Sequence, residues 1–301
     1  MVEINKKSLL AYFRERAEKS LERISKDIPK DFRERAKRMN YEVMVIRESL
    51  IEETLAQAKK KELNSDKILN EILLITYCSY IVMIEYRNRV WNYEYMTFSR
   101  RIGELWDPFC QLCWKYNDDK GIQMFEPPSF KEVREQLQKD ITGFIKNLKI
   151  SEKEKKDLEN YYTITWNLLT SGEINMKLDL HFKKNGKKYV ADLKSGFSSN
   201  EKGNTNRLLL VASIYKSLKE DYGRIIFVRS NEDEANHYLQ TLKNSGLWEV
   251  YCGDKAYDKM KDITGFDIKK WINENVNWKE DFDDKTMKFF EKNNLDIYLK
   301  W

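Results

Sequence analysis

The sequence predicts a mixed α/β protein, with a helical N-terminal region and a core whose central mixed sheet is flanked by helices. Three observations lead to this fold class. Apolar residues recur at helical spacing through residues 6–62, a strand–turn–strand pattern occupies residues 176–194, and strand and helix patterns then alternate up to residue 275. Because strands joined through helices pair in parallel, we expect antiparallel pairing in the hairpin and parallel pairing beyond it.

The helical patterns are interrupted most clearly at Pro127-Pro128-Ser129, and this break predicts two regions, 1–126 and 127–301. The second region is expected to contain, in order, helices over 130–148 and 151–169, the hairpin, a helix over 206–218, a strand over 224–229, a helix over 232–244, a strand over 247–252, a helix over 267–275 and a helical tail over 278–301.

Composition excludes several classes of protein. With 34% charged and 13% aromatic residues the chain is neither disordered nor membrane-like, and we expect no membrane-spanning helix because no apolar run approaches about 20 residues. The N-terminus lacks the layout of a signal peptide, so a cytoplasmic protein is expected. Four cysteines give no disulfide framework in a chain of 301 residues, and Cys110 and Cys113 are expected in the core.

The hairpin around Asn185-Gly186 carries the main functional signal. This dipeptide between alternating runs is typical of a two-residue type I′ turn, in which both central residues have positive φ. The alternation of Met176, Leu178, Leu180 and Phe182 with polar residues predicts one apolar and one polar face. Closing the turn pairs Lys184 with Lys187, Phe182 with Tyr189, Leu180 with Ala191, Asp179 with Asp192 and Lys177 with Lys194.

The register places the carboxylates of Asp179 and Asp192 opposite each other, where like charges repel. A divalent cation between them would convert this repulsion into a binding site, and carboxylates completed by water and phosphate oxygens suit Mg²⁺. Lys194, two residues further along the same face, would polarise a water molecule or stabilise charge on a phosphate. The alternative is a surface hairpin in which Lys177 and Lys194 simply neutralise the two aspartates.

Asp179 followed after a short hairpin by Asp192-Leu193-Lys194 and then a helix resembles the PD-(D/E)xK nuclease superfamily, in particular type II restriction endonucleases. The resemblance covers roughly residues 170–255 and implies a restriction-endonuclease-like core. It also implies Mg²⁺ ligands from Asp179, Asp192 and the Leu193 carbonyl, with Lys194 as the catalytic lysine. Leu178 stands where the family has a proline before the first aspartate.

A second resemblance lies in the segment Arg100–Phe109, which is similar to the Gly-Glu helix that precedes the catalytic hairpin in several restriction endonucleases. In those enzymes an acidic residue approaches the metal site, and Glu104 is the candidate for that role. The alternative is a surface helix on which Glu104 pairs with Arg100 or Arg101.

Contacts to DNA are predicted in two places. Residues 1–40 hold 12 Lys/Arg against 7 Asp/Glu, so 12 − 7 = +5 accounts for the whole net charge. Basic residues concentrate there at Arg33, Arg35 and Lys37, which suits phosphate contacts and equally a solvated helix face. The segment after the hairpin carries Asn204, Asn206 and Arg207, which are expected beside the scissile phosphate or, alternatively, as helix-capping residues.

The function predicted from these features is Mg²⁺-dependent, site-specific cleavage of double-stranded DNA by a homodimer, because a palindromic site presents one strand to each subunit. The helical region 1–126 would supply DNA contacts, dimer contacts or both. Two alternatives stay open: a defence or repair nuclease of the same superfamily without strict sequence specificity, and a catalytically inert DNA-binding module. The chain has no Gly-rich nucleotide-binding loop.

Overall fold

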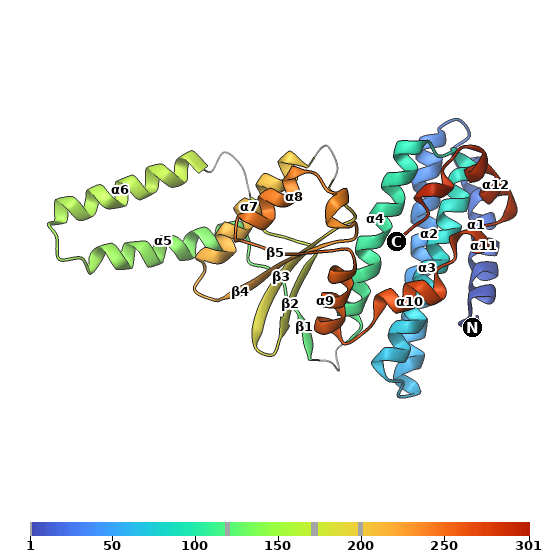
Figure 1. The fold of residues 1–301 in the computed structure, drawn as a ribbon, viewed down its shortest axis with the longest axis horizontal. Helices are drawn as coiled ribbons and strands as arrows, with labels where there is room; N and C mark the ends of the chain where they lie inside the picture. Colours follow the sequence, from blue (N-terminus) through green and yellow to red (C-terminus); the bar gives the residue numbers. More distant parts are fainter. Residues whose placement is uncertain (1, 118–120, 170–173, 198–200) are drawn as a thin grey trace.

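The computed structural model describes residues 2–117, 121–169, 174–197 and 201–301. The fold is mixed α/β, which confirms the predicted class: a five-stranded sheet lies between a large group of helices on one face and a smaller group on the other (Figure 1). Two clusters of buried apolar side chains correspond to these two faces. The sheet is therefore covered on both sides.

The first group of helices is formed by the N-terminal third of the chain. Its members are α1 (Lys6–Asp27), α2 (Phe32–Lys60), α3 (Ser65–Val90) and α4 (Tyr95–Lys115). The first three begin at side chains that accept a hydrogen bond from the first helical turn, namely Asn5, Asp31 and Asn64. Helix α3 is long and apolar enough to span a membrane, contrary to expectation, but 78% of its apolar window is buried in the fold, as in a core helix.

The C-terminal segment packs on the same helices. It contains α9 (Asp254–Thr264), α10 (Ile268–Asn275), α11 (Trp278–Asp281) and α12 (Asp284–Lys292), followed by a short 3₁₀ turn at Asp296–Tyr298. The ring of Trp278 lies 5.3 Å from that of Tyr77 on α3, and Phe290 lies 4.5 Å from Phe98 on α4. One apolar core thus joins the two ends of the chain.

The sheet has the order β1-β2-β3-β4-β5. The strands are β1 (Ile122–Met124), β2 (Leu180–Lys184), β3 (Lys187–Lys194), β4 (Tyr222–Val228) and β5 (Glu249–Cys252). Helices α7 (Lys202–Ser217) and α8 (His237–Asn244) connect β3 to β4 and β4 to β5 and cover the second face. Pairing is antiparallel from β1 to β3 and parallel from β3 to β5, so the predicted change of direction is confirmed.

The β2–β3 turn agrees with the prediction, since Asn185 and Gly186 have φ of +51° and +82°, and the ladder follows the predicted register from Lys184–Lys187 to Leu180–Ala191. The predicted pairs Asp179–Asp192 and Lys177–Lys194 lie outside this ladder, because β2 begins at Leu180. The predicted polar face is wrong. His181 on that face is only 4% exposed, and Leu178 is buried in the second cluster rather than beside Leu180. The reason is that helices cover both faces, as is usual for sheets with parallel strands.

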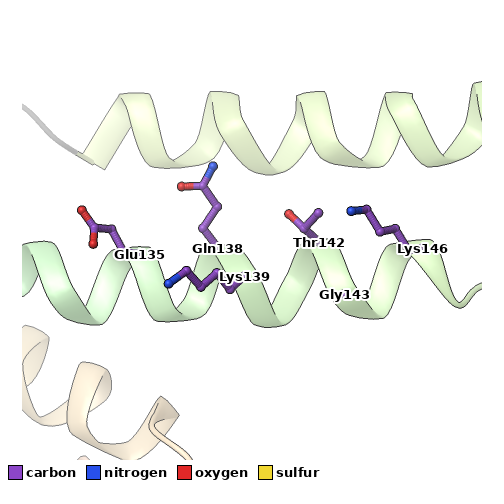
Figure 2. A pocket seen from close by; sticks show the side chains of 6 residues that line it. All are labelled: Glu135, Gln138, Lys139, Thr142, Gly143 and Lys146. Atoms are coloured by element: carbon purple, nitrogen blue, oxygen red, sulfur yellow. The ribbon is translucent and has the colours of Figure 1, made fainter.

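Helices α5 (Phe130–Lys146) and α6 (Glu152–Leu169) form an antiparallel arm that projects from the sheet, away from the helical group (Figure 1). Both start with a reciprocal capping box, one at Ser129 and the other at Ser151. A cleft of about 470 Å³ lies along α5, and Figure 2 shows Gln138 and Thr142 pointing across it toward α6. Apart from Gly143, the residues of α5 that line this cleft have polar or charged side chains.

Candidate active site

The candidate site lies at the carboxyl end of β3, on the face covered by α7. Asp192 and Lys194 alternate with Leu193, so their side chains emerge on the same side of the sheet. The Asp192 side chain is 2% exposed, and its Oδ2 lies 2.6 Å from Lys194 Nζ. Its other oxygen, Oδ1, lies 3.6 Å from Nη2 of Arg207 on α7. A buried carboxylate is thus held between two cations.

Asp179 joins this group from the residue that precedes β2. Its Oδ2 accepts a hydrogen bond from the Leu193 amide at 2.7 Å. If β2 extended further toward the N-terminus, a backbone carbonyl of that strand would accept this hydrogen bond instead. In an extended strand the N–H and C=O of one residue point toward the same neighbour. The Leu193 carbonyl therefore faces the side on which Asp179 lies, and both lie next to Asp192.

Burial and mutual repulsion shape the protonation of this cluster. The pKa of Asp179 is raised to about 6, first by burial and then by the charge of Asp192. Burial alone would lower the pKa of Lys194, but the neighbouring carboxylates of Asp192, Asp179 and Asp107 outweigh it and raise that pKa. Lys194 consequently remains a cation at neutral pH.

Asp107 on α4 is a site residue that the sequence reasoning missed. Burial and the charge of Asp179 raise its pKa to about 7, and its Oδ1 is buried without a hydrogen-bond partner in the described part of the chain. Helix α4 approaches the loop after β3 closely, since a Cβ on Gly103 would lie 2.7 Å from Ser195 Oγ. The only available signal was an acidic residue one turn beyond Glu104, beside Pro108.

Glu104 itself takes the alternative arrangement. Its side chain is 42% exposed and pairs with Arg100 at 2.5 Å and Arg101 at 3.6 Å. These i,i+4 and i,i+3 contacts are typical of a solvated helix face. Asp107, rather than Glu104, is therefore the acidic residue of α4 that lies close enough to Asp179 to interact with its charge.

The residues predicted to contact DNA after the hairpin lie in the first turns of α7, which begins at Lys202. Asn206 is exposed, whereas Asn204 donates a hydrogen bond to Glu201 at 3.0 Å. Arg207 reaches Asp192 and also donates to the Lys177 carbonyl at 3.4 Å. Arg207 thus links α7 directly to the carboxylates.

The basic cluster near the N-terminus lies at the start of α2, in the group of helices on the other face of the sheet (Figure 1). Arg33 and Lys37 are exposed, and Lys37 lies 3.9 Å from Glu34. Arg35 donates hydrogen bonds to the carbonyls of Ser25 and Ile28, which closes the turn between α1 and α2. The Arg35 side chain therefore has a structural contact in this turn, while Arg33 and Lys37 remain accessible.

The donor set at β3 fits a hard divalent cation. It combines the half-buried carboxylate of Asp179 and the buried carboxylate of Asp192 with the Leu193 carbonyl, and it has the orphan oxygen of Asp107 nearby. Within the described residues, no group of three or more His, Cys, Asp or Glu is close enough to hold a metal ion on its own. Such a site would be completed by water and substrate oxygens, as Mg²⁺ sites commonly are.

Comparisons with protein-family models, with curated proteins and with solved structures find no match to this chain. The class of the protein is therefore defined by its own fold and site: a mixed α/β chain with a buried acid–lysine cluster at the carboxyl end of a central strand.

Proposed function

We propose that this chain is a Mg²⁺-dependent endonuclease that hydrolyses phosphodiester bonds in double-stranded DNA, of restriction type and with a restriction-endonuclease-like core. One observation carries the proposal: Asp179 accepts a hydrogen bond from the Leu193 amide within the field of Asp192, and Lys194 Nζ lies 2.6 Å from Asp192. Burying Asp192 and Lys194 carries a desolvation cost, and a hairpin with a purely structural role could avoid this cost by keeping both side chains in solvent.

Each residue has a role in this chemistry. Asp179, Asp192 and the Leu193 carbonyl would hold Mg²⁺, which when bound supplies positive charge to the phosphate and the leaving oxygen. Lys194, 19% exposed, can reach solvent from its buried position and would orient the attacking water or stabilise the developing charge. Arg207 and the exposed Asn206 would contact the DNA beside the scissile bond.

Further properties belong to the same proposal. A palindromic site would be cut by a homodimer, with one subunit acting on each strand. Arg33 and Lys37, which are exposed at the start of α2, would add phosphate contacts. The enzyme would act in the cytoplasm.

The test is incubation of the purified protein with plasmid or phage DNA in Mg²⁺ and, in parallel, in EDTA. Discrete fragments that form only with Mg²⁺ would support site-specific cleavage. A smear would favour the defence or repair nuclease without strict specificity. Intact DNA that is nevertheless retarded in a gel would favour the inert DNA-binding module and contradict the enzyme.

The DNA contacts have a test of their own. Alanine variants of Asn204, Asn206 and Arg207 should lower DNA affinity in EDTA or change the choice of site. Variants with unchanged affinity and unchanged fragments would show that these residues only cap and position α7.

A further inference from the structure

The segment Met176–Asp179 lies outside the β-ladder and yet is firmly anchored. The last ladder pair is Leu180–Ala191, so the backbone groups before it need other partners. Met176 and Leu178 are 3% and 4% exposed and belong to the apolar cluster beneath α7. The chain therefore bends from the second face of the sheet into β2, and Asp179 lies at the bend.

His181 satisfies the backbone at this bend. Its Nε2 accepts a hydrogen bond from the Leu178 amide at 3.3 Å, three residues back along the chain. The imidazole is 4% exposed and packs edge-on against Phe125, with ring centroids 5.8 Å apart. The ring is thus fixed in place, and it fixes in turn the residue that immediately precedes Asp179.

Tyr215 supplies a second anchor from α7. Its hydroxyl donates to the Met176 carbonyl at 3.3 Å, and the side chain is fully buried. Because His181 comes from β2 and Tyr215 from α7, the two side chains hold the bend from different elements. The Asp179 carboxylate then reaches the Leu193 amide at 2.7 Å.

We infer that His181 is a positioning residue for Asp179: by holding the Leu178 amide it sets the bend that aims the Asp179 carboxylate at the cation site beside Leu193. This inference rests on the proposed function, because it treats Asp179 as a ligand of the cation. His181 does not touch the reacting atoms. Groups that orient a metal ligand in this indirect way typically change metal affinity by about 10-fold to 100-fold when they are removed.

The test is titration of the full-length protein with MgCl₂ in a calorimeter, without DNA. His181→Ala should weaken Mg²⁺ binding by about 10-fold or more. His181→Gln, whose side-chain oxygen can accept the same amide hydrogen bond, should retain most of the affinity. Tyr215→Phe, which removes only a hydroxyl group, should weaken binding in the same direction but less, and it serves if His181→Ala does not fold.

Two controls separate positioning from general damage. Val190→Ala removes a fully buried side chain opposite His181 and should lower stability without changing Mg²⁺ affinity. His237→Ala alters the exposed second histidine of the chain and should change neither quantity. Equal losses of affinity in His181→Ala and Val190→Ala would overturn the positioning role.

The remaining outcomes are also decisive. A wild-type protein that binds Mg²⁺ with an affinity unchanged in His181→Ala and Tyr215→Phe would refute the inference while leaving the proposed function intact. A wild-type protein that neither binds Mg²⁺ nor cuts DNA would refute the proposed function, and the positioning role with it.

Discussion

Strand β3 carries a lysine–carboxylate pair at each end, and the two pairs have the same length but different surroundings. Lys188 Nζ lies 2.6 Å from Glu220, with the two side chains 35% and 57% exposed. Lys194 Nζ lies 2.6 Å from Asp192, with exposures of 19% and 2%. The first pair is solvated and screened, whereas the second has lost most of its water and has further carboxylates beside it.

The difference teaches that contact distance alone does not identify a functional ion pair. An exposed pair contributes at most about 1 kcal/mol to stability. A buried pair carries a desolvation cost that its own attraction often fails to offset. In the proposed function a bound cation would offset part of this desolvation cost at the carboxyl end of β3, and each of the following changes tests whether the two ends differ in this way.

The largest effect is expected from removing the carboxylate at each end. Asp192→Asn should abolish both Mg²⁺ binding and DNA cleavage, because this side chain is the proposed cation ligand and also the partner of Lys194. Glu220→Gln should leave cleavage within about twofold of wild type, as surface substitutions usually do. Cleavage rates at saturating Mg²⁺, with calorimetric titration of the metal, measure both effects; an active Asp192→Asn protein would end the comparison.

Removing the lysines should separate chemistry from binding. Lys194→Ala should slow cleavage by about 10²–10³-fold, the loss expected for one preorganised charge donor. DNA affinity in EDTA should remain near wild type because it depends on many phosphate contacts. Lys188→Ala is the matched control from the same strand face. It should change neither the cleavage rate nor the DNA affinity. A Lys194→Ala protein that cuts at the wild-type rate would contradict the assignment.

The two ends should respond to pH in opposite directions. Asp179 and Asp107 have pKa values raised to about 6 and about 7, so their contribution to stability is present below the ordinary carboxyl pKa and is lost as pH rises through 6 to 7. The hydrogen bond from Lys188 lowers the pKa of Glu220, so that pair contributes above the ordinary value and loses its contribution as pH falls.

Deprotonation of Asp179 and Asp107 should therefore make the thermal unfolding midpoint in EDTA lower at pH 8 than at pH 6. Asp107→Asn should reduce this difference. Added Mg²⁺ should raise the midpoint more at pH 8 than at pH 6, because protons compete with the cation for the carboxylates. A stabilisation by Mg²⁺ that does not change with pH would argue against carboxylate ligands of raised pKa.

The smallest effect concerns stability at the exposed end. Lys188→Ala should change the free energy of unfolding by less than about 1 kcal/mol, and high salt should reduce even that difference. Urea denaturation at low and high ionic strength measures it. A larger loss in the free energy of unfolding that persists in high salt would show that side-chain burial does not predict how the two ion pairs differ in their contribution to stability.

The sequence predicted those features that depend on neighbouring residues. Asn185-Gly186 fixed the turn, and counting outward from it gave the register as far as Leu180–Ala191. The bend before Asp179 was not predictable in this way, because it depends on burial of Leu178 beneath α7. An alternating pattern reports that one face is buried but does not reveal whether a polar-looking residue such as His181 is covered by a distant helix.

The third carboxylate illustrates the same limit. Asp107 and Asp179 are 72 residues apart, and only the packing of α4 near Ser195 brings their charges together. The short strand β1 was missed for a related reason, since three residues carry too little periodicity to be recognised. Its partner strand lies beyond the whole arm. Local patterns could not supply these contacts.

The arm has a consequence for how the chain can vary. It is inserted between neighbouring strands: Met124 pairs with Phe182, and the Phe125 amide donates to the His181 carbonyl at 3.0 Å. Since the ends of the insertion already meet, doubling its length would cost only about 0.6 kcal/mol of closure entropy. Whole helical turns can thus be gained or lost at the tip, so the reach of the molecule can change without altering the spacing of Asp179 and Asp192.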